Sequence, residues 1–320
     1  MNFSSSSQAQ ISQSTVNNTI IHANSVQLTN TQRRRSGFKS LSARSEKDGA
    51  SMIFDQEISK TRVEMLVDVR QGLPVINYVA KHEEISRKIV GESGQWFLKT
   101  KEFEDWKNGK FTGIIAVGHP GAGKSCLFSL VVSHLQEQGK PVRVVYLYLD
   151  HQQAESQTPT NIISTLLHQL LLSYSELPES ATALYSQLGL DQGLPPLRVL
   201  VSTLIALCRD TNYRTYIVLD AFDESKPSFQ TELAHILEDL LKAQVQLFAT
   251  TRPSAERLVT LADGIHFKKV PIQATASDLS MFLKEKLNAK RTFQSLVGTD
   301  FGQEVIKTIV SKSEGVYVII

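Results

Sequence analysis

Residues 118–125 read Gly118-His119-Pro120-Gly121-Ala122-Gly123-Lys124-Ser125 and fit the pattern G-x-x-x-x-G-K-[ST] without a mismatch. An apolar run at 112–117 leads into this stretch, and apolar residues at 127, 131 and 135 mark one face of the segment that follows. A buried strand, a glycine-rich turn and a helix are therefore expected in this order. That order is typical of a nucleotide-phosphate site in a sheet with helical crossovers.

The residue types in this loop suit phosphate chemistry. Glycines let consecutive backbone N–H groups curl round a β-phosphate, and the helix N-terminus adds a partial positive charge. Lys124 is expected to reach the β- and γ-phosphates, and the Ser125 hydroxyl is expected to coordinate Mg²⁺. Cys126 is expected to pack as a small apolar residue, with a helix-terminal thiol of lowered pKa as the alternative. The predicted nucleotide-binding residues are Gly118, His119, Pro120, Gly121, Ala122, Gly123, Lys124, Ser125 and Cys126.

A second apolar run, at 216–219, ends in Asp220, and Asp223 and Glu224 follow shortly after it. The carboxyl ends of parallel strands form the ligand-binding edge of such a sheet, so these carboxylates are expected beside the loop. Asp220 is predicted to hold Mg²⁺, mostly through water. Glu224 is the first choice as the general base that polarises an attacking water, with Asp223 beside it. A solvated acidic loop that caps a helix is the alternative for this pair.

A third run, at 245–250, ends in Thr251-Arg252-Pro253. An arginine at the tip of the strand beside Asp220 can sense the γ-phosphate or stabilise charge on it. We therefore place Arg252 among the predicted catalytic residues, with plain surface charge as its alternative. Histidines 119, 134 and 151 have no metal-ligand partners at suitable spacing in the sequence, and they are expected in loops or on the surface.

Beyond residue 110, short β-branched runs alternate with longer helical patterns, which predicts an α/β fold. We expect a parallel five-stranded sheet in the order 5-1-4-3-2, sandwiched by helices. A strand between the P-loop strand and the Asp220 strand is typical of additional-strand P-loop NTPases, and it favours water as the phosphoryl acceptor. The strands are expected at 112–117, 142–149, 215–219, 245–250 and 265–270, each buried on both faces. The helices are expected at 124–138, 160–174, 196–210, 228–243, 254–262, 276–290 and 302–312.

Composition limits the class of protein. With 320 residues the chain has room for about two domains, and 41% apolar residues can form a core. The formal charge of +2 gives no whole-chain argument for nucleic acid or an anionic membrane, so neither is expected as a partner. Two cysteines exclude a disulfide scaffold and favour a reducing, cytoplasmic location. No apolar run approaches the ~18 residues that a membrane span needs.

Three segments are predicted along the chain. Residues 1–52 form a Ser-, Asn- and Gln-rich basic tail that is expected to be disordered. Residues 53–110 form a helical segment, with helices near 53–71 and 76–90 and with aromatic residues at 96, 97, 103 and 106 that are expected to pack in a core rather than stack on a nucleotide. Residues 111–320 form the NTPase domain. For the basic tract at 33–36, a solvated linker is favoured over an import signal, an anionic-surface patch or a transit peptide.

Five motifs in order carry a resemblance to a known family. They are Gly94-Gln95-Trp96-Phe97-Leu98 with Glu102, Phe103 and Trp106; the loop 118–125; Gln157-Thr158; Leu219-Asp220-Ala221-Phe222-Asp223-Glu224; and Thr251-Arg252-Pro253. Over roughly residues 75–320 the chain resembles the fungal NACHT-type (STAND) P-loop NTPases. Their P-loop segment is also described as a nephrocystin-like N-terminal domain.

The resemblance implies a signal-transduction NTPase in which nucleotide state and oligomerisation are coupled. Such proteins carry an N-terminal effector and, after the NTPase, helical segments and ligand-sensing repeats. A homo-oligomer and effector or repeat-containing partners are therefore expected. This chain departs from the family at both ends, and we interpret residues 111–320 as a C-terminally incomplete domain of a fragment, a truncated gene model or a reduced member.

Three functions are compatible with the motifs. The favoured one is a switch that binds Mg²⁺-NTP and hydrolyses it slowly. A non-catalytic scaffold that holds nucleotide is the alternative, and a nucleic-acid-processing ATPase has only the basic tail in its favour. The motifs contact phosphate and Mg²⁺, which every NTP shares, so the sequence leaves ATP and GTP open.

Overall fold

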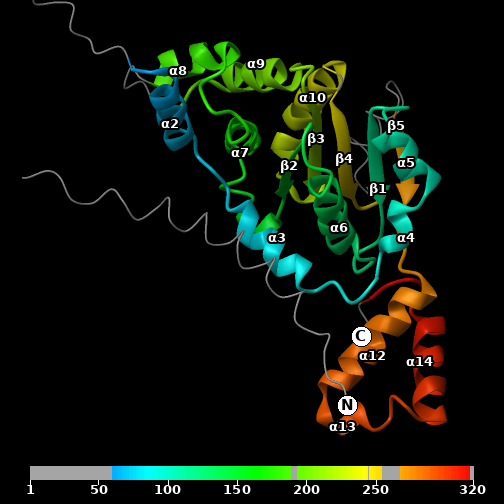
Figure 1. The fold of residues 1–320 in the computed structure, drawn as a ribbon. Helices are drawn as coiled ribbons and strands as arrows, with labels where there is room; N and C mark the ends of the chain where they lie inside the picture. Colours follow the sequence, from blue (N-terminus) through cyan, green and yellow to red (C-terminus); the bar gives the residue numbers. More distant parts are fainter. Residues whose placement is uncertain (1–59, 189–192, 244, 254–266, 318–320) are drawn as a thin grey trace, which may run out of the picture. The chain divides into compact units, whose positions relative to one another are not determined.

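Five parallel strands form one sheet in the order β2-β3-β4-β1-β5 (Figure 1). The strands are β1 (Gly113–Val117), β2 (Val142–Tyr148), β3 (Arg214–Asp220), β4 (Gln246–Thr251) and β5 (Phe267–Pro271). The computed structural model describes residues 60–188, 193–243, 245–253 and 267–317. Read from the other edge, the strand order is the predicted 5-1-4-3-2, so the predicted α/β P-loop NTPase fold is confirmed.

Helices surround the sheet, and several of them begin at clear sequence signals. Thr61 and Glu64 form a capping box before α2, and Thr158 caps α7, which has Pro159 in its first turn. The described α-helices are α2 (Arg62–Gly72), α3 (Tyr78–Ser86), α4 (Gln95–Leu98), α5 (Lys101–Lys107), α6 (Lys124–Gln136), α7 (Pro159–Leu171), α8 (Thr182–Leu188), α9 (Leu197–Cys208), α10 (Pro227–Lys242), α12 (Ala276–Ala289), α13 (Arg291–Gln294) and α14 (Asp300–Lys312). The 3₁₀ turns are η1 (His151–Gln153), η2 (Glu179–Ala181) and η3 (Phe222–Glu224).

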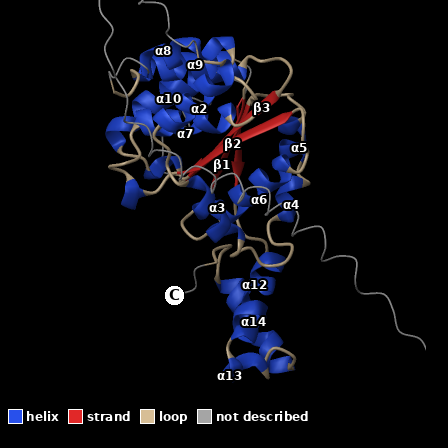
Figure 2. Ribbon diagram, turned by 60° about the vertical axis from the view of Figure 1, so that its left-hand side comes forward, coloured by secondary structure: helices blue, strands red, loops and turns tan. Residues whose placement is uncertain are grey.

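The sheet has a hydrophobic core on each face, with helices as the outer layers (Figure 2). Successive side chains of a strand point to opposite faces. Ile115 and Ile217 therefore pack on one face with α2, α7, α8, α9 and α10. Ile114 and Val218 pack on the other face with α3, α4, α5 and α6. Burial on both faces explains why the inner strands have continuous apolar sequences.

Aromatic side chains before β1 belong to the second of these cores, as predicted. Phe97, Phe103 and Trp106 are fully buried. The Trp106 ring lies 5.3 Å from the Tyr216 ring and 5.8 Å from the Phe248 ring, measured between centroids. These contacts attach α4 and α5 directly to the sheet. The predicted domain boundary at residue 110 remains a prediction.

We expect Trp106→Ala to lower the free energy of unfolding by about 3–5 kcal/mol, because it removes a large, fully buried side chain from a close-packed core. Denaturant unfolding followed by circular dichroism measures this change. The matched control is Phe301→Ala on α14, where the side chain is 64% exposed and the expected change is below about 0.5 kcal/mol. Equal destabilisation by the two variants would contradict this packing.

Three details differ from the sequence-based expectation. β5 is not buried on both faces: Val270 is buried, whereas Lys268 and Lys269 are exposed. It is an edge strand beside β1, and lysines at an edge discourage pairing with another chain. The helix expected near 76–90 ends at Ser86, where the backbone N–H groups of Lys88 and Ile89 bond only three residues back and the chain leaves the helix in a tighter turn. α8 was not predicted at all. The expected tail at 1–52 and the expected helix at 254–262 lie outside the described residues.

α12 and α14 follow the last strand and pack against each other. α12 begins with a second capping box, in which the Thr275 hydroxyl accepts from the Asp278 backbone and the Asp278 side chain accepts from the Thr275 backbone. In the part of the chain that the structure describes, every helix is too short or too polar to cross a membrane.

Candidate functional site

The loop at 118–125 joins β1 to α6 at the carboxyl edge of the sheet. Gly121 and Gly123 have φ angles of +77° and +85°, a left-handed conformation that glycine adopts without strain. Gly118 is closely packed, since a Cβ at this position would lie 2.8 Å from the carbonyl oxygen of Ile272. Backbone geometry therefore requires these glycines, in addition to the phosphate chemistry for which they were predicted.

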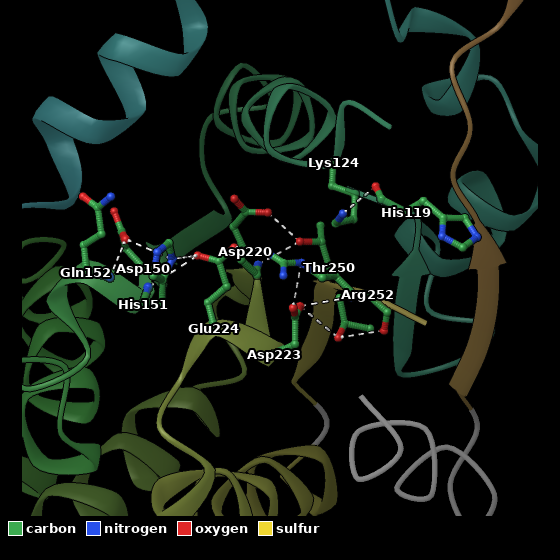
Figure 3. Close-up of polar contacts among 12 residues, drawn as sticks. His119, Lys124, Asp150, His151, Gln152, Asp220, Asp223, Glu224, Thr250 and Arg252 are labelled. Carbon is green, nitrogen blue, oxygen red and sulfur yellow. Dashed lines mark hydrogen bonds and ion pairs between the residues drawn. The ribbon is translucent and has the colours of Figure 1, made fainter. Parts of the chain in front are cut away.

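The Lys124 ammonium lies over this loop (Figure 3). Its Nζ donates hydrogen bonds to the carbonyl oxygens of Gly118 at 2.8 Å and His119 at 3.0 Å. Burial lowers the pKa of Lys124, and the nearby carboxylates of Asp223 and Asp220 oppose that shift. Lys124 is thus a pre-positioned cation at the N-terminus of α6, where the helix dipole also favours an anion.

Asp220 ends β3 and is only 3% exposed. Its Oδ1 accepts a hydrogen bond of 2.5 Å from Thr250 Oγ1 on the neighbouring strand β4. Burial raises the pKa of Asp220, while hydrogen bonds from Ser125 and Thr250 and the charge of Lys124 oppose the shift. Ser125 and Asp220, the two predicted Mg²⁺ ligands, therefore lie together. A hydroxyl and a carboxylate are hard oxygen ligands, so this donor pair fits Mg²⁺.

A strained turn follows Asp220. Ala221 has φ +52° and ψ +50°, a left-handed conformation that is uncommon for a residue with a Cβ. The backbone N–H of Glu224 donates to the Ala221 carbonyl oxygen at 2.8 Å, which closes the turn η3. This turn brings Asp223 and Glu224 to the carboxyl edge of the sheet, where the sequence places them.

Arg252, at the end of β4, binds these two acidic side chains (Figure 3). Its backbone N–H donates to Asp223 Oδ1 at 3.0 Å, and its Nε lies 3.2 Å from Asp223 Oδ2. Its Nη2 donates to Glu224 Oε1 at 2.7 Å. The structure thus brings the predicted sensor and the predicted base together, but as an ion pair. The Nε and Nη2 atoms of Arg252 are therefore engaged by carboxylates, while the side chain remains 42% exposed.

Sequence reasoning missed a contact on the other side of Glu224. The backbone nitrogen and Nδ1 of His151 each lie 3.4 Å from Glu224 Oε2. One ligand atom each from Asp150, His151 and Glu224 lie within 4.8 Å of one another. His151 comes shortly after the end of β2, and β2 lies beside β3 in the sheet. The predicted strand order was therefore enough to expect His151 near Glu224. As expected, His151 is a largely exposed loop residue.

A cavity of about 430 Å³ opens beside the loop. Asp223, Glu224 and Arg252 line one end of it, and Val90, Trp96, Phe282 and Tyr317 are among the side chains that line the rest. The cavity therefore combines a charged end at the P-loop with apolar walls, as a nucleotide requires.

Cys126 also lines this cavity, one residue after the predicted Mg²⁺ ligand Ser125. Burial raises the pKa of its thiol, so the alternative of a helix-terminal thiol with a lowered pKa is wrong. Desolvation of the thiolate outweighs the favourable helix dipole here. Cys126 is half-buried and contributes a small apolar surface to the cavity wall, as expected.

Three hydrogen bonds join α12 and the segment after α14 to the rim of the cavity. The buried Asp278 accepts from the Gly94 backbone N–H at 3.1 Å and from Trp96 Nε1 at 2.9 Å. The Tyr317 backbone N–H donates to the carbonyl oxygen of Gly121 at 2.8 Å. The sequence analysis did not single out Asp278 or Tyr317. In the sequence, Asp278 looks like an ordinary helix-capping residue.

Residues 92–252 match the model of the protein family described as nephrocystin 3, N-terminal. The matched segment runs from the turn before α4 to Arg252 and includes the loop, Asp220 and Glu224. No curated protein matches the chain.

Several solved structures are similar to the chain at low identity. The replication initiator DnaA bound to AMPPCP and single-stranded DNA has 16% identity and a TM-score of 0.38 over 72% of this chain and 60% of that chain. AMPPCP-bound DnaA from Aquifex aeolicus has 18% identity and a TM-score of 0.38 over 71% of this chain and 58% of that chain. The Aeropyrum pernix ORC1 protein in complex with DNA has 16% identity and a TM-score of 0.40 over 72% of this chain and 54% of that chain. The chain thus spans about three fifths or less of the length of these proteins.

Proposed function

Since the chain belongs to the nephrocystin 3 N-terminal family, we propose that it binds Mg²⁺ with ATP or GTP and hydrolyses the nucleotide slowly. One observation carries this proposal: Lys124 and Ser125 of the loop lie at the same edge of the sheet as Asp220 and Glu224, which come about 100 residues later in the sequence. These are a phosphate-binding cation, two oxygen ligands for Mg²⁺ and a carboxylate base. Their types and their common location suit phosphoryl transfer to water.

Each residue has a defined part in this proposal. The backbone N–H groups of the loop and the Lys124 ammonium bind and orient the phosphates. Ser125 and Asp220 hold Mg²⁺, which when bound neutralises charge on the phosphate oxygens. Glu224 accepts a proton from the attacking water, and Arg252 moves from Glu224 to the γ-phosphate and stabilises its charge. Asp223 accepts a hydrogen bond from the Arg252 backbone N–H and so keeps the Arg252 backbone in place while the Arg252 side chain moves.

We further propose that nucleotide occupancy controls the helices α12 to α14, as expected of a signal-transduction switch. The support is that Asp278 and Tyr317 bond to the two sides of the cavity rim. A nucleotide that shifts either wall would change these contacts.

Homo-oligomerisation and effector or repeat-containing partners are part of the same proposal and rest on the resemblance to NACHT-type proteins.

The second candidate function is a scaffold that binds nucleotide without hydrolysing it. The observation that favours it is the engagement of both Glu224 oxygens, Oε1 by Arg252 and Oε2 by His151. Because each oxygen already contacts a neighbouring side chain, neither is free to accept a proton from an attacking water. In this alternative, the ion pair persists when nucleotide binds.

The test is phosphate release by the full 320-residue chain with Mg²⁺ and either ATP or GTP, together with equilibrium binding of both nucleotides. We expect binding and slow turnover, with a clear preference for one base. Binding without phosphate release supports the scaffold. A chain that folds but binds neither nucleotide contradicts both functions.

A further inference from the structure

Thr250 is a buried residue of β4 that the sequence analysis treated only as the end of a strand. The neighbouring strands β3 and β4 are in register through the pair Leu219 and Ala249. Thr250 is the next residue along β4, as Asp220 is along β3, which places its side chain beside the predicted Mg²⁺ ligand. Thr250 is fully buried, so its hydroxyl must be satisfied within the protein.

The Thr250 hydroxyl forms a bridge with a fixed direction (Figure 3). A hydroxyl has one hydrogen to donate and two lone pairs that accept. Thr250 Oγ1 donates its hydrogen to Asp220 Oδ1 at 2.5 Å and accepts the backbone N–H of Ala221 at 2.8 Å. Serine could form the same bridge, whereas valine, which has nearly the same shape, can form neither bond.

This bridge connects two parts of the proposed machinery. On one side, the Thr250 hydroxyl donates to one oxygen of the Asp220 carboxylate. The same carboxylate also receives a hydrogen bond from Ser125. The other end holds the N–H of Ala221, the residue in the strained left-handed conformation that starts the turn to Glu224. One hydroxyl therefore fixes the rotamer of the metal-binding carboxylate and the start of the turn that carries the base.

We propose that Thr250 is a positioning residue that orients Asp220 for Mg²⁺. This inference rests on the proposed function. It gives a role to a residue that lies outside both the loop at 118–125 and the acidic stretch at 220–224. Residues that hydrogen-bond a metal ligand orient it, and their loss commonly weakens metal binding about 10- to 100-fold. Thr250 is fully buried and is not among the residues that line the cavity, so the proposed role acts through Asp220.

The structure offers a matched control on the adjacent strand. Thr215, near the other end of β3, is also buried, but its Oγ1 has no hydrogen-bond partner among the described residues. Thr215→Val therefore removes a buried hydroxyl of the same kind without breaking a bond. Any effect shared by Thr215→Val and Thr250→Val reflects the loss of a buried hydroxyl in general.

The test measures binding of fluorescently labelled ATP and GTP to the full chain at a series of Mg²⁺ concentrations and in EDTA. A direct Mn²⁺ titration followed by electron paramagnetic resonance gives a second readout. For Thr250→Val we expect the half-saturating Mg²⁺ concentration to rise about 10- to 100-fold, with unchanged affinity in EDTA. Thr250→Ser and Thr215→Val should stay within about threefold of wild type. Circular dichroism checks the fold, and Thr250→Ala, which cannot clash with its neighbours, replaces the valine variant if that variant does not fold.

The outcomes separate the two proposals. If the wild type binds nucleotide with a Mg²⁺ dependence that Thr250→Val leaves unchanged, the role of Thr250 is overturned and the proposed function stands. An equal loss in Thr250→Val and Thr250→Ser, or in Thr215→Val, also overturns that role. If the folded wild type binds no nucleotide with or without Mg²⁺, the proposed function fails and the inference about Thr250 fails with it.

Discussion

Replacing Lys124 with alanine is expected to weaken nucleotide binding about 100- to 1,000-fold. The structure holds the Lys124 ammonium over the loop with two carbonyl oxygens, so little ordering is needed when phosphates bind. Hydrogen bonds to charged groups contribute about 1.5–3 kcal/mol each, and a loss of about 3–4 kcal/mol, the lower end for two bonds to phosphate oxygens, gives a reduction of this size. Equilibrium titration with ATP and GTP in Mg²⁺ measures it.

The control for this experiment is Lys242→Ala. Lys242 ends α10 and pairs with Asp239 on an exposed part of that helix. Its removal takes away the same charge from the chain, so it accounts for any general electrostatic effect. We expect affinity within about twofold of wild type. A Lys124→Ala variant that folds and keeps wild-type affinity would show that the loop does not bind phosphate.

Glu224→Gln is expected to reduce phosphate release about 100- to 10,000-fold while nucleotide binding is kept. Glutamine has the same shape as glutamate but cannot take up the proton of the attacking water, and general base catalysis contributes a factor of this size. The change also breaks the ion pair with Arg252, which leaves the guanidinium free for the γ-phosphate. Binding of the triphosphate should therefore be equal to wild type or tighter. Single-turnover phosphate release, measured beside equilibrium titration, separates the two effects.

Two comparison variants make this result specific. Glu232→Gln removes an exposed carboxylate on α10 and should leave turnover unchanged. Asp223→Asn weakens the anchor of Arg252 and should lower turnover less than Glu224→Gln does. If Asp223→Asn abolishes turnover and Glu224→Gln does not, the base is Asp223. Wild-type turnover in Glu224→Gln would remove the carboxylate base from the mechanism.

The inner part of the sheet was predictable because burial on both faces leaves a mark in the sequence. β3 was expected at 215–219 and is Arg214–Asp220, and β4 was expected at 245–250 and is Gln246–Thr251. β5 was predictable in position but not in exposure. It is an edge strand, and that depends on its pairing with β1, far away in the chain. α8 is short, and only Leu184 in it is buried, so it has little periodicity from which to predict it.

The residues proposed to bind phosphate could be picked out in the sequence because they form one continuous loop whose types and spacing suit phosphate chemistry. The contacts that restrain them were not. The pair Arg252 and Glu224 is separated by 28 residues, and Trp96 and Asp278 are separated by 182. Such pairs depend on how strands and helices are placed in space, and neither partner has an unusual sequence environment. The roles predicted for these residues await the measurements above.

The strand order also bears on how the chain folds while it is being synthesised. β1 leads into the loop at 118–125, but its partners β4 and β5 come about 130 residues or more later in the chain. At a ribosomal rate of about 5–20 residues per second, roughly 7 to 25 seconds pass before the first partner is made. During that time a wholly apolar strand, Gly113–Val117, has both of its edges unpaired. The loop at 118–125 therefore reaches its final position late, and β1 stays open to pairing with other chains until β4 has been made.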